Sequence, residues 1–279
     1  MNVGDWVIPV SAGLGTWASH VITPESEGGA DRWFPVPSSI PIGDGATLMV
    51  NPCTAYRMLN DFVPLRRNDI VVQNGATSGV GTAVIQIAKA RSLRTINIVR
   101  DRPNMDETRA ELTALGATAV LSESEAADKT KSAEILEKAG ISADEHAKLG
   151  LNCVAGTSTL TLSRFIAPKG TIVTYGGMSR KPVMMGVGQF IFRDITLKGF
   201  WMTRWSQEHG RHDEQRAKMM NELIGLVLTD QLHTKTKIHY VGSKEDLDAA
   251  VAFAETGHKG AKSLLSFWPD WQSYEAKSE

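Results

Sequence analysis

The sequence has 279 residues, of which 42% are hydrophobic and 22% are charged, and its formal net charge is −1 at pH 7. This near-neutral balance gives no electrostatic reason to expect nucleic acid or an anionic membrane surface as a partner, and no apolar run reaches the ~18 residues of a membrane span. Cys53 and Cys153 lie far apart in apolar surroundings without metal-ligand spacing, so we expect buried, reduced thiols and no metal site.

Residues 1–50 are predicted to form short strands and loops, followed by a helix. The segments are Asp5–Val10, the glycine-rich Ser11–Thr16 and Trp17–Thr23, with dense proline and glycine from Pro24 to Gly45. Asn51 and Pro52 then open a helix predicted over Thr54–Phe62, because proline is tolerated in the first turn of a helix.

From Asp69 onward, strand-like and helix-like segments alternate, as in a parallel sheet with crossover helices. The predicted strands are Ile70–Gln73, Thr95–Val99, Ala119–Leu121, Leu149–Val154, Thr171–Tyr175 and Ile195–Phe200. The predicted helices are Thr82–Arg91, Met105–Leu115, Lys131–Ala139 and Ser158–Phe165, and Ser122–Thr130 is expected to be a solvated loop. The pattern predicts an α/β fold with a doubly wound parallel sheet of the Rossmann type.

The chain after this sheet is predicted to hold one long helix, a short strand, a second helix and a final strand. In order these are Gln207–Leu228, Lys235–Tyr240, Lys244–Thr256 and Ser263–Phe267, before a mainly polar tail, Trp268–Glu279.

A strand, a glycine turn and a helix meet at residues 70–90, where the glycines follow the pattern Gly75-x-x-x-Gly79-x-Gly81. Glycine lets the backbone approach a pyrophosphate, and the start of a helix supplies N–H groups and a favourable dipole. The spacing differs from the usual G-x-G-x-x-G, so an ordinary strand-to-helix turn is the alternative. The apolar strand before the turn and the amphipathic helix after it favour a dinucleotide site.

Two arginines, Arg100 and Arg102, lie at the end of the second predicted strand. An acidic residue about 20 positions after the glycines would hold the ribose 2′-hydroxyl, whereas arginine suits a 2′-phosphate. The predicted cofactor is therefore NADPH rather than NADH. Two alternatives stay open: the arginines are solvated charges at a strand end, or Asp101 between them takes a ribose hydroxyl.

Several longer stretches resemble one known family. They read VGDWVIPVSAGLGTW, NPCTAYRML, SGVG, RTINIVRDRP, LGLNCVAG, VTYGGM and LKGFW. Together they resemble the mitochondrial trans-2-enoyl thioester reductases of the medium-chain dehydrogenase/reductase superfamily, over Val3 to about Phe267. Quinone reductases of that superfamily share the glycine turn but are not expected to carry NPCTAY, RDRP and GFW together.

The resemblance implies a reaction, a partner and a cellular location. A hydride would pass from NADPH to the β-carbon of a 2-enoyl thioester on acyl carrier protein or coenzyme A, in mitochondrial fatty acid synthesis. It also implies a homodimer, because related reductases pair through the edge of the cofactor-domain sheet. The visible start of the chain shows no presequence, which leaves the cytosol open.

The resemblance further implies which residues bind the cofactor. By matching motif, these are Asn51 beside the nicotinamide, Thr77, Ser78, Gly79 and Val80 at the pyrophosphate, Arg100, Asp101 and Arg102 at the adenosine phosphate, Tyr175, Gly176, Gly177, Met178, Phe200, Trp201 and Met202 bordering the nicotinamide, and Lys262 from the C-terminal part. Without the resemblance, the simpler alternatives are a helix cap at Asn51, a turn at Gly176-Gly177, core packing for Phe200 and Trp201, and a surface lysine at Lys262.

The family carries a further N-terminal stretch, which holds the first strands of a mainly β, GroES-like catalytic domain and the proton-donor tyrosine. None of Tyr56, Tyr175, Tyr240 and Tyr274 lies in a matching context, so no catalytic residue is named. We expect a remnant of the catalytic domain at residues 1–50, an NADPH-binding Rossmann domain at 51–234 and the C-terminal part of the catalytic domain at 235–279.

On this basis the chain is expected to bind NADPH and to reduce enoyl thioesters poorly or not at all. The alternatives are a quinone oxidoreductase and a catalytically inactive NADPH-binding or interaction protein.

Overall fold

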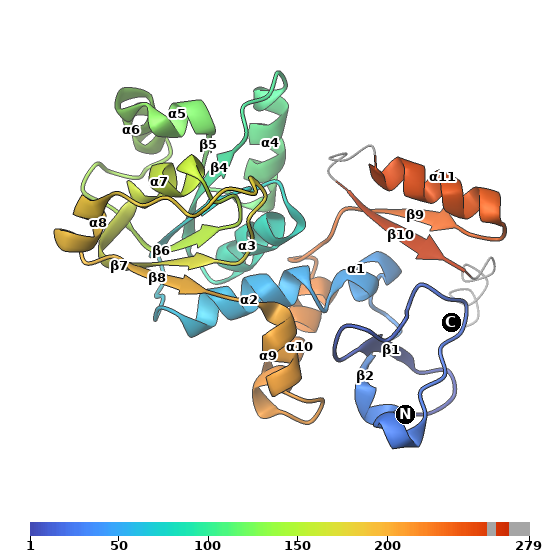
Figure 1. Cartoon of the computed structure of the whole chain (residues 1–279). Coiled ribbons are helices and arrows are strands. Elements are labelled where there is room, and N and C mark those ends of the chain that lie inside the picture. Colours follow the sequence, from blue (N-terminus) through green and yellow to red (C-terminus); the bar gives the residue numbers. More distant parts are fainter. Residues whose placement is uncertain (256–260, 268–279) are drawn as a thin grey trace. The chain divides into compact units, whose positions relative to one another are not determined.

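The structure is a computed structural model that describes residues 1–255 and 261–267. The chain forms two compact units: unit 1 combines Met1–Val50 with Thr203–Glu279, and unit 2 is Asn51–Met202 (Figure 1). The sequence-based division after residue 234 thus differs from the second boundary between compact units, which follows Met202. The assignment of these units to a catalytic and a cofactor domain stays a prediction.

Unit 2 is built around a six-stranded parallel sheet with the order β5-β4-β3-β6-β7-β8 (Figure 1). The strands are β3 (Ile70–Asn74), β4 (Arg94–Val99), β5 (Ala119–Ser122), β6 (Ala147–Asn152), β7 (Ile166–Thr174) and β8 (Thr196–Gly199). The chain starts at the central β3, steps outward through β4 and β5, and returns to pair β6 with the other side of β3. This reversal of direction confirms the predicted doubly wound α/β fold and puts its switch point between β3 and β6.

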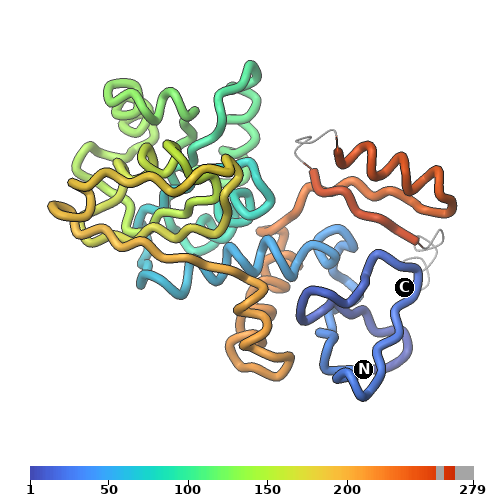
Figure 2. Tube along the Cα trace, viewed as in Figure 1, coloured from blue at the N-terminus to red at the C-terminus, as the bar shows by residue number. Residues whose placement is uncertain are grey.

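The helices of unit 2 lie mainly between consecutive strands, and Figure 2 follows this path of the chain. They are α2 (Asn51–Asp61), α3 (Gly79–Ala90), α4 (Met105–Leu115), α5 (Glu123–Ala127), α6 (Lys129–Lys138), α7 (Thr157–Ser163) and α8 (Val187–Ile191).

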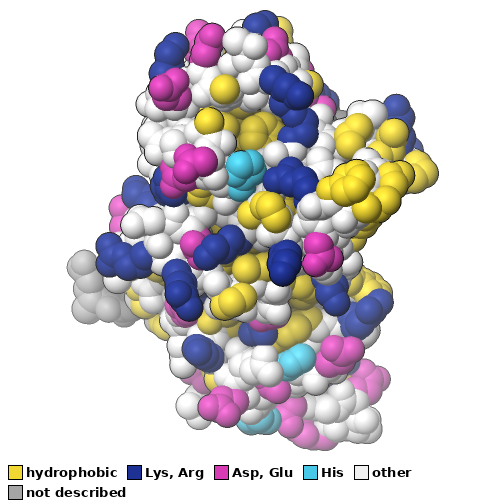
Figure 3. Space-filling view, turned by 90° about the vertical axis from the view of Figure 1, so that its left-hand side faces the viewer, with side chains coloured by type: hydrophobic (Ala, Val, Ile, Leu, Met, Phe, Trp, Pro, Cys, Tyr) yellow, Lys and Arg dark blue, Asp and Glu magenta, His cyan; other side chains and the backbone are white. Residues whose placement is uncertain are grey.

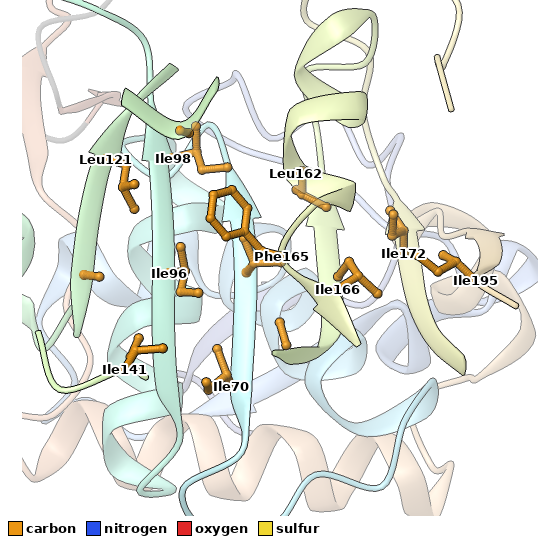
Figure 4. Packing of buried hydrophobic residues seen from close by; sticks show 14 residues of the cluster. Ile70, Ile96, Ile98, Leu121, Ile141, Leu162, Phe165, Ile166, Ile172 and Ile195 are labelled. Atoms are coloured by element: carbon orange, nitrogen blue, oxygen red, sulfur yellow. The ribbon is translucent and has the colours of Figure 1, made fainter. Parts of the chain in front are cut away.

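Two apolar cores flank the sheet, because successive side chains of a strand point to opposite faces. On one face, Ile96 and Ile98 of β4 belong to a cluster with Leu162 of α7 and with Phe165 (Figure 4). On the other face, Val99 clusters with Ile85 of α3. Full burial of each such side chain stabilises the fold by about 1.5–3 kcal/mol.

The segment Ser122–Thr130 was expected to be a loop, and that prediction is wrong: it holds α5 and the start of α6. Ser122 Oγ accepts a hydrogen bond from Glu125 N at 3.2 Å, and Glu125 Oε2 accepts one from Ser122 N at 2.7 Å. This reciprocal capping box starts a helix in spite of the polar composition. The short helices α8 and α1 (Ile42–Thr47) were also not predicted.

The long helix predicted over Gln207–Leu228 is interrupted. α9 (Met202–Glu208) ends before Gly210, and α10 (Glu214–Leu228) begins after Asp213. The Asp213 carboxylate accepts a hydrogen bond from Arg216 N at 3.0 Å, as a helix N-cap does. No apolar side chain lies between Trp205 and Ala217, and the sequence-based prediction overlooked Gly210 and Asp213 in this polar stretch as signals of a helix end and a helix start.

Unit 1 contains two small sheets. β1 (Trp6–Pro9) pairs antiparallel with β2 (Trp33–Val36), and β9 (Thr236–Tyr240) pairs parallel with β10 (Lys262–Ser266) across helix α11 (Lys244–Glu255). Two 3-10 turns, Glu25–Glu27 and Gly29–Arg32, precede β2, while residues 17–23 form no strand. Thr256, predicted to end the α11 helix, and the tail Trp268–Glu279 lie outside the described residues.

The surface carries charges of both signs. Figure 3 shows basic, acidic and apolar side chains interspersed over one face, in keeping with the formal net charge of −1. Among the helices that the structure describes, none is both long and apolar enough to cross a membrane.

Candidate functional site

The turn between β3 and α3 is shaped by glycines that no larger residue could replace without strain. Gly75 has a φ of +62°, and a Cβ there would lie 2.4 Å from Cys153 Sγ. A Cβ at Gly81 would lie 2.6 Å from the backbone oxygen of Ala76. Side chains are excluded on both sides, and so the turn brings bare backbone to the carboxyl end of β3.

Helix α3 begins immediately after this turn. Ser78 is its N-cap, and Ser78 Oγ accepts a hydrogen bond from Gly81 N at 3.1 Å. The N–H groups of Gly79 and Val80, at the very start of the helix, have no acceptor within it. Together with the helix dipole, such N–H groups can bind an anion, and their binding of the cofactor pyrophosphate stays a prediction.

Two buried amides support the turn from the α3 face of the sheet. Gln73 and Asn97 are fully buried, and Gln73 Nε2 donates to Gly81 O at 2.9 Å and to Asn97 Oδ1 at 2.8 Å. Asn97 Nδ2 in turn donates to Ala119 O at 3.0 Å. The first turn of α3 is thereby tied to three strands of the sheet.

A second amide pair lies on the opposite face, at the switch point. Asn74 Nδ2 donates to Asn152 Oδ1 at 2.8 Å and to Ser158 Oγ at 3.1 Å. Asn74 Oδ1 accepts from Cys153 N at 2.8 Å. These fully buried asparagines join β3 to β6 just below the turn. Sequence reasoning missed them, although polar residues in otherwise apolar strands were a visible signal.

The arginine segment follows β4 at the same edge of the sheet, and Arg100 is exposed. Arg102 Nη2 lies 3.4 Å from Thr77 Oγ1, so the guanidinium reaches the glycine turn. The Asp101 carboxylate is engaged elsewhere: it accepts hydrogen bonds from Ser124 Oγ at 2.5 Å and from Ser124 N at 3.1 Å. The structure therefore brings Arg102 close to the glycine turn and directs the Asp101 side chain toward α5.

Residues 175–178 extend from the end of β7 toward the same edge. Tyr175 N donates to Asn152 O at 3.0 Å, and Met178 N donates to Cys153 O at 2.9 Å. No atom lies within 4 Å of a Cβ built at Gly177, so the backbone there is open on one side.

The Tyr175 hydroxyl is buried without a hydrogen-bond partner in the described part of the chain. Burial, with the Cys153 thiol nearby, raises the pKa of Tyr175 well above its ordinary value, so the hydroxyl is neutral. Burial likewise raises the pKa of the Cys153 thiol. The neutral hydroxyl thus lies near Ser78 of the glycine turn and near the Cys153 thiol, where a polar ligand could accept a hydrogen bond from it.

The remaining predicted residues come from three segments. Phe200 N donates to Thr174 O at 3.0 Å, and its ring meets Phe62 edge-on at a centroid distance of 5.9 Å. Trp201 is 58% exposed, whereas Met202 is buried. Asn51 is the first residue of α2, which packs against α3. Lys262 is exposed at the start of β10 in unit 1, and its place in the site stays a prediction.

The residues of unit 2 fit the cofactor that the sequence predicts. The carboxyl ends of parallel strands meet at one edge of the sheet, where ligands of doubly wound folds bind. Here that edge carries an anion-binding helix start, a guanidinium, an unsatisfied hydroxyl and an open glycine. In the part of the chain that the structure describes, no group of three or more His, Cys, Asp or Glu residues could hold a metal ion.

Comparison with known proteins identifies the relatives of this chain. The family model described as zinc-binding dehydrogenase matches residues 79–220. Mitochondrial enoyl-[acyl-carrier-protein] reductase of Bos taurus is 45% identical over 229 residues, covering 82% of this chain and 58% of the bovine protein. The reductase of the same name from Xenopus tropicalis is 43% identical over 266 residues, covering 95% of this chain and 72% of its own length.

Solved structures agree. A mutant form of enoyl thioester reductase from Candida tropicalis has a TM-score of 0.83 at 32% identity, over 96% of this chain and 74% of that one. A complex of Etr1p with NADP and crotonyl-CoA has a TM-score of 0.85 at 32% identity, with the same coverage. A quinone oxidoreductase of Pseudomonas syringae, at 22% identity and a TM-score of 0.72, shares the fold. The chain thus spans little more than half of the bovine relative, and it belongs to the family of the mitochondrial enoyl-[acyl-carrier-protein] reductases among the zinc-binding dehydrogenases.

Proposed function

We propose that the chain binds NADPH at the carboxyl edge of the unit 2 sheet and serves the reduction of 2-enoyl thioesters. The observation that carries this proposal is the convergence of the α3 helix start and Arg102 on one turn, with a distance of 3.4 Å between Arg102 Nη2 and Thr77 Oγ1. The start of α3 suits a pyrophosphate, and the Arg102 guanidinium suits the 2′-phosphate that distinguishes NADPH from NADH.

When bound, NADPH supplies the hydride that would reduce the β-carbon of the substrate. The chain's own residues would hold and orient it: the N–H groups at the start of α3 bind phosphate, and Gly177 leaves room for close approach. The neutral Tyr175 hydroxyl can donate a hydrogen bond at the same edge. We assign no proton donor to the reaction.

The substrate class comes from the relatives. Proteins that are 42–47% identical carry the name enoyl-[acyl-carrier-protein] reductase, and a structural neighbour was solved with crotonyl-CoA. We propose the same substrate class, 2-enoyl thioesters, for this chain. The thioester carrier would be acyl carrier protein or coenzyme A, and the protein would act in the mitochondrion. The quinone reductases are less similar, at 22–23% identity, which supports a common fold and no common substrate.

A homodimer is the second part of the proposal. A structural neighbour is described as a heterodimer of Etr1p and Etr2p, two 2-enoyl thioester reductases of Candida tropicalis. We infer a self-pairing of this chain in the same manner, and the molar mass in solution, measured by light scattering after gel filtration, tests it. A mass equal to one chain at micromolar concentration would refute the pairing.

The central test follows NADPH fluorescence on titration with the purified chain, and then NADPH oxidation after addition of a 2-enoyl-CoA. Binding together with turnover supports both the NADPH binding and the reduction of enoyl thioesters. Binding without turnover of either an enoyl-CoA or a quinone would agree with the poor activity expected from the sequence, and it would refute a reductase activity of this chain by itself. Turnover with a quinone alone would favour the other oxidoreductase class.

A further inference from the structure

The position of Asp101 bears on whether the chain prefers NADPH or NADH. It is the second residue after β4, and a free carboxylate at this place would accept hydrogen bonds from the ribose hydroxyls of NADH and repel the 2′-phosphate of NADPH. The sequence alone leaves both readings open, because Asp101 lies between two arginines.

The structure shows that this carboxylate already has partners. Ser124 donates to it twice, from its hydroxyl at 2.5 Å and from its backbone N–H at 3.1 Å. Partial burial raises the pKa of Asp101, but hydrogen bonds from Ser122 and Ser124 outweigh this and bring the pKa below its usual value. The side chain is therefore an ionised carboxylate whose oxygens are bonded to the first turn of α5.

The neighbouring arginine has the opposite orientation. Arg102 Nη2 approaches Thr77 Oγ1 in the glycine turn, and Arg102 Nε donates to Arg100 O at 3.3 Å. The turn leads into α3, which packs on one face of the sheet, while α5 belongs to the core of the other face. The Asp101 carboxylate therefore points toward α5, and the Arg102 guanidinium points toward the glycine turn between β3 and α3.

We propose that Ser124 is a specificity-determining residue for the cofactor: it holds the Asp101 carboxylate against α5 and so leaves the arginines to receive a 2′-phosphate. The inference rests on the proposed NADPH binding and adds the residue that sets the preference over NADH. Ser124 does not touch the cofactor in this account; it acts through Asp101, as a positioning residue.

The test compares dissociation constants for NADPH and NADH, measured by fluorescence at fixed salt with the full chain and its variants. Ser124→Ala is expected to weaken NADPH binding and strengthen NADH binding, so that the ratio of the two constants changes by about five- to tenfold. Ser124→Thr keeps the hydroxyl and should retain the wild-type ratio. Should Ser124→Ala fail to fold, as judged by circular dichroism, Ser124→Cys replaces it, because a thiol of similar size donates only a weak hydrogen bond, and the same direction of change in the ratio is expected.

Asp101→Asn is the decisive background. It removes the charge, so NADPH should bind at least as tightly as to the wild type, and adding Ser124→Ala to it should change the ratio no further. Ser142→Ala is the matched control. Ser142 Oγ likewise donates to a carboxylate, Asp144 Oδ1 at 2.7 Å, but it precedes β6 and lies away from the carboxyl edge.

The outcomes separate this inference from the proposed function. A wild-type chain that binds NADPH tightly, with the same ratio in Ser124→Ala, would overturn the role of Ser124 and leave the proposed function standing. The same shift by Ser124→Ala in both the wild-type and the Asp101→Asn backgrounds would overturn it too, because the effect would not pass through Asp101. A wild-type chain that binds neither cofactor would overturn the proposed function itself.

Discussion

The β3–α3 and β5–α5 turns lie at the same edge of one sheet, and they differ in which acceptors bind the N–H groups at the start of their helices. The β3–α3 turn is made of small residues, and the N–H groups of Gly79 and Val80 have no acceptor within their helix. At the β5–α5 turn, Ser124 N, which holds the position of Val80 N, is bonded to the Asp101 carboxylate. Both turns have a serine N-cap, Ser78 and Ser122.

A helix start can bind an external anion only where the protein's own acceptors leave its N–H groups free. At α5 two carboxylates, those of Glu125 and Asp101, already occupy this position. At α3 no acidic residue lies in the first turn. The same topology therefore gives one open turn and one closed turn, and substitutions at the two turns are expected to affect cofactor binding and stability differently.

Gly75→Ala should abolish the open turn. The new Cβ would lie 2.4 Å from Cys153 Sγ, at a φ of +62°, so we expect a loss of about 3 kcal/mol in the free energy of unfolding together with loss of NADPH binding. Urea denaturation followed by circular dichroism measures the first. Gly140→Ala is the matched control, because Gly140 has a φ of +76° with no atom within 4 Å of its Cβ position. It should cost about 1 kcal/mol, and equal losses in both variants would contradict the steric argument.

Arg102→Ala should weaken NADPH binding about tenfold and leave NADH binding unchanged, because the guanidinium contributes only to a 2′-phosphate. Fluorescence titration with both cofactors gives the two constants. Lys129→Ala, which removes an exposed positive charge on α6, should alter neither. An equal loss for NADPH and NADH in Arg102→Ala would place the arginine at a phosphate common to both cofactors.

Ser78→Ala removes the hydroxyl that accepts from Gly81 N at 3.1 Å. Loss of an N-cap costs about 1 kcal/mol in the free energy of unfolding. We also expect the dissociation constant of the NADPH complex to rise by about two- to threefold, because the turn is less ordered. The effect should be independent of pH between about 3 and 8, because a hydroxyl does not titrate there. A stability loss confined to low pH would contradict this account.

Glu125→Gln should change the free energy of unfolding least, and its pH dependence should show how much the ionised Glu125 carboxylate stabilises the closed turn. Burial raises the pKa of Glu125, but hydrogen bonds from Ser122 and Arg109 bring it below the ordinary 4.5, so the stabilisation is present above pH 4.5 and is lost as the pH falls below it. Unfolding free energy, measured between about pH 5 and pH 3, should fall less steeply in Glu125→Gln than in the wild type. Equal slopes would show that the capping carboxylate contributes no pH dependence.

Much of the fold could be predicted because apolar periodicity is a local property. The six strands of the sheet and its major helices follow from runs such as Ile70–Gln73 and from amphipathic spacing in α3. The helix α5 was missed since its signal was a capping box in a polar segment, Ser122 with Glu125 three residues later. The break between α9 and α10 was missed although Gly210 and the N-cap residue Asp213 lie in a polar stretch between the apolar residues of the two helices.

The candidate site divides in the same way. Gly75, Gly81 and Arg102 could be recognised from spacing, because the chemistry they serve needs them at fixed distances along the chain. The pairs Gln73–Asn97 and Asn74–Asn152 could not, since each joins two strands that are adjacent only in the folded sheet.

The order of residues along the chain is enough to locate the turns between strand and helix, the glycine-rich turn among them, and the positive charges after the second strand of the sheet. Which of the neighbouring charges lies near the glycine turn depends on the folded arrangement of the sheet. Asp101 and Arg102 are neighbours in sequence, and Asp101 is bonded to Ser124, 23 residues away, while Arg102 reaches Thr77, 25 residues back. The physical reason is that backbone conformation follows from near neighbours, whereas the partner of a charge depends on which strands the sheet places side by side.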